Sequence, residues 1–292
     1  MASHFPRIRA WQQLLPWAAM LLIGSALAQP VPDSAAALRA RHTQLAAQME
    51  NTPFQRPVVL QSSEVGNDLQ GSIDAVVAQP FALAREHLQK PAALCEILML
   101  QINTKQCTVS GNALDVRIGR KYDQPLEDAY RVAFTLQPLA SSADYMSLRL
   151  GADTGPFSTR DYRIQLQAIP LEGGSKTFLH LRYSYGMGLT AKLAMQSYLA
   201  TLGAGKVGFT RTSGSGYIGG MRGAVERNTM RYYLAIDAYL ASLAAPAAQQ
   251  RAHRLDSWFT ATEQYARQLH EVERADYLAM KQKEFRRLPA IA

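Results

Sequence analysis

The glycine-rich stretch from Leu202 to Gly220 is the part of the sequence that most strongly suggests ligand chemistry, because it holds seven of the nineteen glycines. It contains GAGK, as in a phosphate-binding loop, and GSGYIG, which fits the dinucleotide pattern G-x-G-x-x-G. A phosphate-binding loop also needs an earlier glycine and a hydroxyl after its lysine, but Ala200 and Val207 stand at those positions. Only helical patterns follow the second motif, without the parallel βαβ unit of a dinucleotide fold. We therefore predict a flexible loop and no nucleotide ligand.

The other reactive residue types do not form a known catalytic pattern. The six histidines have no metal-ligand spacing, and no G-x-S-x-G nucleophile motif occurs. We therefore expect no metal and no cofactor. An enzyme of the cyclase or hydrolase kind stays an alternative, in which Tyr183, His180 or Glu226 would serve as acid or base.

The first 28 residues have the pattern of a secretory signal peptide. Arg7 and Arg9 supply the positive region, residues 14–23 form the apolar segment, and Ala-Leu-Ala ending at Ala28 is a small-x-small cleavage site. The apolar segment is shorter than the roughly 20 residues that a membrane-spanning helix needs. We predict cleavage after Ala28 and a periplasmic or secreted protein.

Cys95 and Cys107 are the two cysteines of the chain. In an oxidising compartment, two cysteines at this spacing most simply form a disulfide. A zinc site would need neighbouring histidines or a second cysteine pair, and the sequence around them has neither. The sequence therefore predicts a structural disulfide.

The chain has a basic excess, with a formal charge of +8 that falls to +6 when Arg7 and Arg9 leave with the signal peptide. On an exported protein this excess favours solubility or transient contact with an anionic membrane surface, and not binding of nucleic acid. The basic residues near the C-terminus are interpreted as a solvated helix end; they are Lys281, Lys283, Arg286 and Arg287.

Hydrophobic periodicity divides the chain into helical and extended segments. Alternating apolar and polar residues recur from 114 to 185, with turn residues between the runs. This alternation predicts an antiparallel sheet with one apolar and one polar face. Two more extended segments precede it, at 58–61 and 69–77. Helical patterns occupy 33–50, 80–90, 93–100, 191–202, 221–245 and 247–287.

The order of these elements between residues 65 and 245 resembles the helix-grip fold of the START and polyketide-cyclase-like (SRPBCC) superfamily. The segments GRKYDQPLEDAYRV, STRDYRIQLQAIPL, FLHLRYSYGMG and GGMRGAVERNTMRYYLAIDAYL are similar to exported START-like proteins of Gram-negative bacteria. The resemblance implies an α+β fold in which a curved antiparallel sheet grips a long C-terminal helix. It also implies an apolar cavity between them that holds a hydrophobic or amphipathic small molecule, with a lipid as the leading candidate.

The expected organisation is a signal peptide (1–28), an N-terminal helical segment and linker (29–60), a START-like domain (61–246) and a charged helical extension (247–292). A third class of function, in which these C-terminal helices bind a partner protein, stays open. On the long helix, Arg222 and Glu226 lie four residues apart and are expected to pair on the helix surface.

The ligand is expected to contact apolar and aromatic side chains of the sheet and the long helix, with two arginines at the rim. Arginine suits a carboxylate or phosphate, although Arg160 could equally be a charge that protects a sheet edge. The alternative to a pocket of about 300–1,000 Å³ is a packed core. The predicted ligand-binding residues are Phe134, Leu148, Arg160, Ile164, Leu181, Arg182, Tyr183, Val225, Tyr232 and Ile236.

Overall fold

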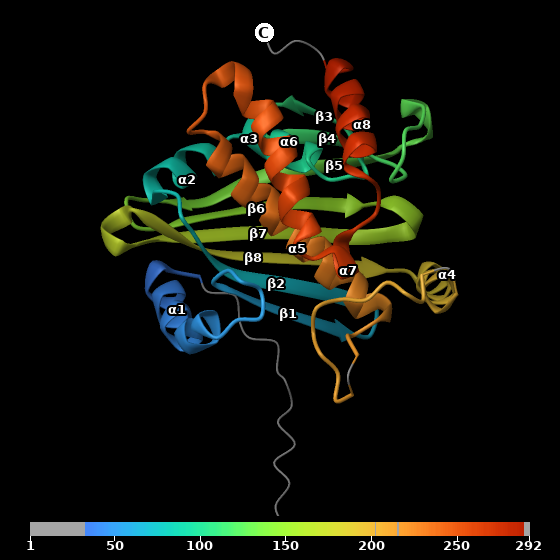
Figure 1. Cartoon of the computed structure of the whole chain (residues 1–292), viewed down its shortest axis with the longest axis horizontal. Helices are drawn as coiled ribbons and strands as arrows, with labels where there is room; N and C mark the ends of the chain where they lie inside the picture. The colour runs from blue at the N-terminus through green and yellow to red at the C-terminus, as the bar shows by residue number, and fades with distance from the viewer. Residues whose placement is uncertain (1–32, 202, 215, 289–292) are drawn as a thin grey trace, which may run out of the picture. The chain divides into compact units, whose positions relative to one another are not determined.

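An eight-stranded antiparallel sheet organises the described part of the chain, residues 33–201, 203–214 and 216–288 of this computed structural model (Figure 1). The proposed signal peptide and its cleavage site lie outside these residues. The strands follow one another across the sheet in the order β1-β2-β8-β7-β6-β5-β4-β3. Their bounds are β1 (Val58–Val65), β2 (Asp68–Val77), β3 (Thr104–Ser110), β4 (Ala113–Ile118), β5 (Tyr130–Ser141), β6 (Met146–Thr154), β7 (Thr159–Leu171) and β8 (Lys176–Met187).

Helices precede, interrupt and follow the sheet. None of those in the described residues is long and apolar enough to cross a membrane. Short 3-10 turns occur at Leu126–Asp128, Pro156–Ser158 and Glu172–Gly174. The α-helices are α1 (Ala35–Glu50), α2 (Phe81–Leu88), α3 (Pro91–Met99), α4 (Leu189–Ala200), α5 (Gly220–Ser242), α6 (Ala247–Glu263), α7 (Ala266–Leu269) and α8 (Arg274–Arg286).

The long helix α5 packs against β1, β2 and β8 and, on its other side, against α6 (Figure 1). A side chain at Gly71 of β2 would not fit there, since a Cβ would lie 2.2 Å from the Thr229 Oγ1 atom of α5. Gly71 therefore sets how closely helix and sheet approach. The predicted α+β helix-grip fold, with a curved antiparallel sheet and a long C-terminal helix, is confirmed.

The sheet has two faces, which we call the α5 face and the α1 face. Along β8, Leu181 and Tyr183 belong to the large core under α5, whereas Phe178 belongs to a second core that also contains Leu38 and Leu45 of α1. The expectation of one apolar and one polar face was therefore incomplete. The sequence pattern of the sheet did not indicate that α1 folds back to cover part of the second face.

A buried ionic cluster fastens α1 to this face. Arg41 donates two hydrogen bonds to Asp74 of β2, at 2.6 and 2.7 Å, and Nδ1 of His180 lies 2.8 Å from the same carboxylate. Burial alone would raise the pKa of Asp74, but the hydrogen bonds from His180 and Arg41 lower it below its ordinary value. The charges are thus paired in the interior, as buried charges must be.

The predicted disulfide between Cys95 and Cys107 is confirmed, with the two Cα atoms 5.4 Å apart. It joins α3 to the edge strand β3, which the sequence did not predict. The strand begins with the buried residues Thr104 and Lys105, and a bulge between Thr104 and Gln106 interrupts its alternation. Its apolar periodicity is therefore too weak to indicate a strand.

The C-terminal helix α8 covers this edge of the sheet. The Lys281 ammonium donates to the carbonyl of Thr104 at 2.7 Å and to Glu284 at 2.8 Å, and Lys105 also binds Glu284 at 3.0 Å. Lys281 is 0% exposed, so its interpretation as part of a solvated helix end was wrong. The acceptor on the edge strand is the backbone carbonyl of Thr104, and the charged residues near Lys281 in the sequence do not indicate it.

Candidate functional site

Eight of the ten predicted ligand-binding residues belong to one hydrophobic core between the sheet and α5. Seven of them are buried, and Tyr232 is partly buried. The structure therefore brings these side chains together, as the alternation of the strands and the helical spacing on α5 imply. They are Phe134, Leu148, Ile164, Leu181, Tyr183, Val225, Tyr232 and Ile236.

The two predicted arginines lie apart from this core. Arg182 alternates with Leu181 and Tyr183 along β8 and so lies on the α1 face, where it donates to Gln70. Arg160, at the start of β7, keeps 57% of its side chain exposed and lies 3.5 Å from the Asp161 carboxylate. Neither arginine is brought beside the eight core residues.

Four tyrosine rings from the sheet and α5 meet in this core, and we call them the tyrosine cluster. Tyr183 and Tyr232 have ring centroids 5.3 Å apart, and Tyr185 lies 5.4 Å from both Tyr183 and Tyr162. These are ordinary distances for aromatic contacts. The cluster places four phenol groups within one region of an otherwise apolar interior.

The phenols of the cluster differ in their hydrogen bonding. The Tyr162 hydroxyl lies 2.7 Å from Thr159 Oγ1. Within the described residues, the hydroxyls of Tyr183, Tyr185 and Tyr232 have no hydrogen-bond partner. Burial raises the pKa of all three phenols well above the ordinary value. They are therefore neutral at physiological pH and can each donate a hydrogen bond.

Glu226 of α5 does not pair with Arg222, which corrects the sequence-based expectation. Its buried carboxylate accepts from the backbone N–H groups of Phe209 and Thr210, at 2.6 and 2.9 Å, and from the hydroxyls of Thr210 and Ser62, both at 2.6 Å. Arg222 donates to Ser62 instead. The glycine-rich loop (203–219, with 215 outside the described residues) covers this face of the helix and supplies three of the four donors, and β1 supplies the fourth.

Two glycines explain why this loop can lie on α5. A Cβ at Gly208 would lie 2.4 Å from Glu226 Oε2 and 2.9 Å from the Cα atom of Gly223. A Cβ at Gly223 would meet the Ile218 carbonyl at 2.8 Å. Gly208 of the loop and Gly223 of α5 therefore allow close packing of backbone on backbone, and neither belongs to the GAGK or GSGYIG motif.

The lysine of the GAGK motif has a protein carboxylate as its partner. Lys206 donates to Glu271 at 2.7 Å, and Arg231 binds the same carboxylate at 2.8 Å. Burial alone would raise the pKa of Glu271, but Arg231 and Lys121 bring it to about 2. Glu271 thus ties the glycine-rich loop to the segment between α7 and α8.

The three residues suggested as acid or base lie in three different surroundings. Tyr183 is in the tyrosine cluster, His180 contacts Asp74 on the α1 face, and Glu226 holds the glycine-rich loop. An acid and a base that act on one substrate must reach the same bound molecule. These side chains do not form such a constellation.

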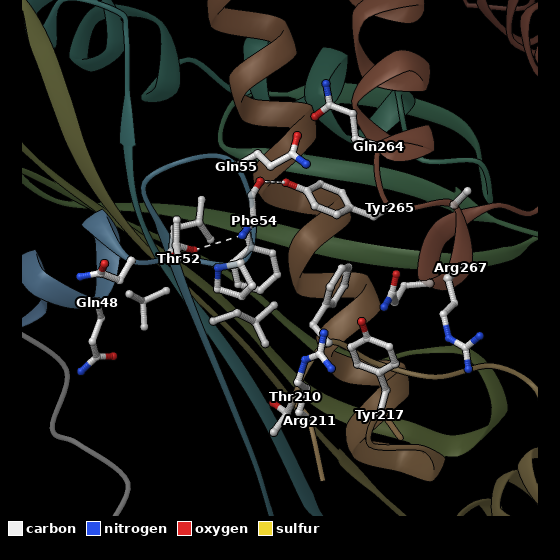
Figure 2. Close-up of a pocket in the computed structure, with 18 of the residues that line it drawn as sticks. Gln48, Thr52, Phe54, Gln55, Thr210, Arg211, Tyr217, Gln264, Tyr265 and Arg267 are labelled. Atoms are coloured by element: carbon white, nitrogen blue, oxygen red, sulfur yellow. Dashed lines mark hydrogen bonds between the residues drawn. The ribbon is translucent and has the colours of Figure 1, made fainter. Parts of the chain in front are cut away.

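A groove of about 750 Å³ lies beyond the edge strand β1, and no sequence pattern indicated it (Figure 2). Four segments form its walls: 47–55, 58–60, the glycine-rich loop and the junction of α6 with α7 at 264–268. They are far apart in the sequence, and none of the ten predicted residues lines it. Only long-range packing creates this groove.

Aromatic side chains make the apolar part of the groove. The rings of Phe54, Phe209 and Tyr265 contact one another edge to face, with centroids 5.6 to 6.1 Å apart. The Tyr265 hydroxyl donates to the Phe54 carbonyl at 2.7 Å and so fixes the loop before β1 (Figure 2). At one end Arg211 and Arg267 flank Tyr217, with guanidinium carbons 5.3 and 5.7 Å from its ring centre.

Comparison with known proteins gives no matching family model and no matching curated protein. Solved structures do match. A START superfamily protein from Mycobacterium smegmatis has 13% identity and a TM-score of 0.32, over 46% of this chain and 92% of the other. Truncated norcoclaurine synthase from Thalictrum flavum has 12% identity and a TM-score of 0.31, over 50% and 89%. A protein from Thermus thermophilus has 8% identity and a TM-score of 0.37, over 60% and 99%.

One of these neighbours is described as a START superfamily protein, the superfamily that the sequence resembles. At these identities the likeness concerns the fold alone. What this chain binds has to be argued from its own residues.

Proposed function

We propose that the protein binds an amphipathic small molecule, with a lipid as the leading class, between the sheet and α5. The observation that carries this proposal is the tyrosine cluster, in which Tyr183, Tyr185 and Tyr232 present hydroxyls without a hydrogen-bond partner among the described residues. These three hydroxyls are not among the fully enclosed unpaired polar atoms of the described residues, so each is open to an acceptor from outside the protein. A bound molecule with a carboxylate, carbonyl or hydroxyl would supply the missing acceptor.

The surroundings of the cluster suit the rest of such a molecule. Leu148, Ile164 and Leu181 of the sheet belong to the same core as Val225 and Ile236 of α5, and all are apolar. An apolar body among these side chains and a polar group at the phenols would combine hydrophobic burial with a few placed donors, as is typical of small-molecule sites. Tyr183 is 4% exposed, so most of its side chain is buried among these apolar groups.

Binding is favoured over acid–base catalysis because Tyr183, His180 and Glu226 have separate surroundings and separate partners. The idea that the C-terminal helices act as a partner interface has less support, since Trp258, Tyr277 and Phe285 are buried in the chain's own core. The buried faces of these helices are therefore used by the protein's own fold.

We also propose that the protein is exported and cleaved after Ala28. The disulfide between Cys95 and Cys107 supports this proposal, because disulfides persist mainly in oxidising compartments. Transient contact of the basic protein with an anionic membrane surface would give a lipid ligand a route of entry. Mass spectrometry of the mature N-terminus tests the cleavage.

Ligand retention tests the function directly. Native mass spectrometry and lipid extraction of the purified protein should find a bound amphipathic molecule. Leu181→Trp should reduce its retention at little cost in stability if the tryptophan fills ligand space, whereas in a packed core it should destabilise by about 1–3 kcal/mol. Leu139→Trp, at a residue 49% exposed, is the matched control. A clean unliganded mass together with strong destabilisation by Leu181→Trp would contradict the proposal.

A further inference from the structure

We infer that the groove beyond β1 is a second binding site, which takes a small amphipathic anion: an apolar body that carries a carboxylate or a phosphate. This inference is independent of the ligand proposed between the sheet and α5, because it depends on different residues. The groove of about 750 Å³ has the volume of an ordinary small-molecule site.

The charge at one end of the groove is the first reason. Arg211 and Arg267 both stack on the ring of Tyr217, and neither has a hydrogen bond or an ion pair among the described residues. The described residues that line the groove include no aspartate or glutamate. Stacking orders the two guanidinium groups but leaves their N–H donors unused, and guanidinium suits carboxylate and phosphate. This end of the groove is therefore complementary to an anion.

The aromatic wall is the second reason. Phe54, Phe209 and Tyr265 line the same groove as the two arginines, and each is partly or largely buried. Their contacts with one another leave a continuous apolar surface that an inorganic anion alone would not use. A ligand that covers this wall and reaches the arginines must be both apolar and anionic.

The groove is held open by contacts within the protein. Tyr265 fixes the Phe54 carbonyl, Glu226 fixes the backbone at Phe209, and Thr52 Oγ1 donates to the Val58 carbonyl at 2.8 Å. A site whose walls are fixed in advance loses less conformational entropy when a ligand binds.

These contacts also favour a small molecule over an extended peptide added to the edge of β1. The Val58 carbonyl is occupied by Thr52, and the Ser62 carbonyl accepts from Arg222 at 3.1 Å. A peptide strand would need these acceptors for its backbone hydrogen bonds. The edge is therefore poorly suited to strand addition.

Matched naphthalene compounds test the inference on the full-length mature protein. 2-Naphthoate and 2-naphthyl phosphate are the anionic probes, and 2-naphthamide is the neutral one, with affinities measured by isothermal titration calorimetry. We expect both anions to bind more tightly than the amide. Arg211→Gln combined with Arg267→Gln should weaken the anions about tenfold or more and leave the amide nearly unchanged, since each guanidinium contributes charge-assisted hydrogen bonds.

The control variant combines Arg120→Gln with Arg163→Gln, which removes the same net charge at exposed positions elsewhere. It should leave binding of the anions within about twofold, because exposed distant charges are screened by salt. Phe209→Leu should weaken all three probes by removing part of the aromatic wall. The inference would be overturned if the anions showed no saturable binding. It would also be overturned if the two arginine double variants lost equal affinity for the anions.

Leu181→Trp separates this site from the one under α5. It should leave binding of the naphthalene anions unchanged while it reduces retention of the endogenous ligand. If it abolishes anion binding as well, the probes bind under α5 and the inference about the groove is wrong, whatever the outcome for the proposed function.

Discussion

The carboxylate of Glu226 accepts a hydrogen bond of 2.6 Å from the backbone N–H of Phe209. Glu226 lies on α5, six residues before Tyr232 of the tyrosine cluster, whereas the Phe209 ring lines the groove beyond β1. One buried carboxylate therefore fixes the glycine-rich loop to the helix that carries the other candidate site. The loop's position depends on this contact as well as on the close approach at Gly208 and Gly223.

Replacement of Glu226 by alanine should loosen the loop. The change leaves the N–H groups of Phe209 and Thr210 without an acceptor, which should lower the free energy of unfolding by about 1–3 kcal/mol. Hydrogen exchange at residues 207–210 should speed up more than exchange in β6 or β7. An equal increase in exchange rate at all positions, relative to the wild-type protein, would contradict a local role for Glu226.

Gly71→Ala should destabilise the contact between β2 and α5. The new Cβ would lie 2.2 Å from Thr229 Oγ1, so helix or sheet must shift, at a cost of about 1–3 kcal/mol in chemical denaturation. Thr229→Ala in the same chain should recover part of the loss. Gly205→Ala, where a Cβ has no heavy atom within 4 Å, is the control and should change stability little.

Loss of the disulfide should weaken the fold without abolishing it. Replacement of Cys95 and Cys107 by serine should lower the free energy of unfolding by about 2–4 kcal/mol, because the bridge restrains the unfolded chain. Denaturant titrations of the two proteins measure the difference. Two reactive thiols in the denatured, unreduced wild-type protein would show that the bridge does not form.

The phenols of the tyrosine cluster should make the protein sensitive to alkali. Burial raises the pKa of Tyr183, Tyr185 and Tyr232 in the folded state, while an unfolded phenol ionises near pH 10. Below about pH 10 the phenols are neutral in both states, so their contribution to stability is complete. Above it the unfolded chain loses its protons first, and the free energy of unfolding falls as the pH rises.

Denaturant titrations between pH 8 and pH 11.5 measure this fall, and absorbance near 295 nm follows the ionisation. Tyr185→Phe combined with Tyr232→Phe should make the fall less steep. An unchanged slope in that variant would show that other groups cause the alkaline sensitivity.

The antiparallel strands from β4 to β8 could be predicted because their alternation is a local pattern, and the family resemblance implied their contact with the long helix. Period-two alternation requires Leu181 and Tyr183 to share a face, and together with the helical spacing of Val225, Tyr232 and Ile236 on α5 it placed eight of the ten expected residues in one core. The same alternation places Arg182 on the opposite face. The prediction that Arg182 lies at the rim of the ligand cavity therefore conflicted with the alternation along β8.

Contacts between distant segments were decided by the tertiary structure alone. Glu226 has a suitable partner four residues away in Arg222, yet its carboxylate binds a loop that packs over the helix and offers better-placed donors. Lys281 is buried because the edge of β3 offers it a carbonyl. Phe54, Phe209 and Tyr265 come from three segments with no common periodicity. Hydrophobic patterns report which face of an element is buried, but which segments meet beyond the edge of a sheet depends on the packing of the whole chain.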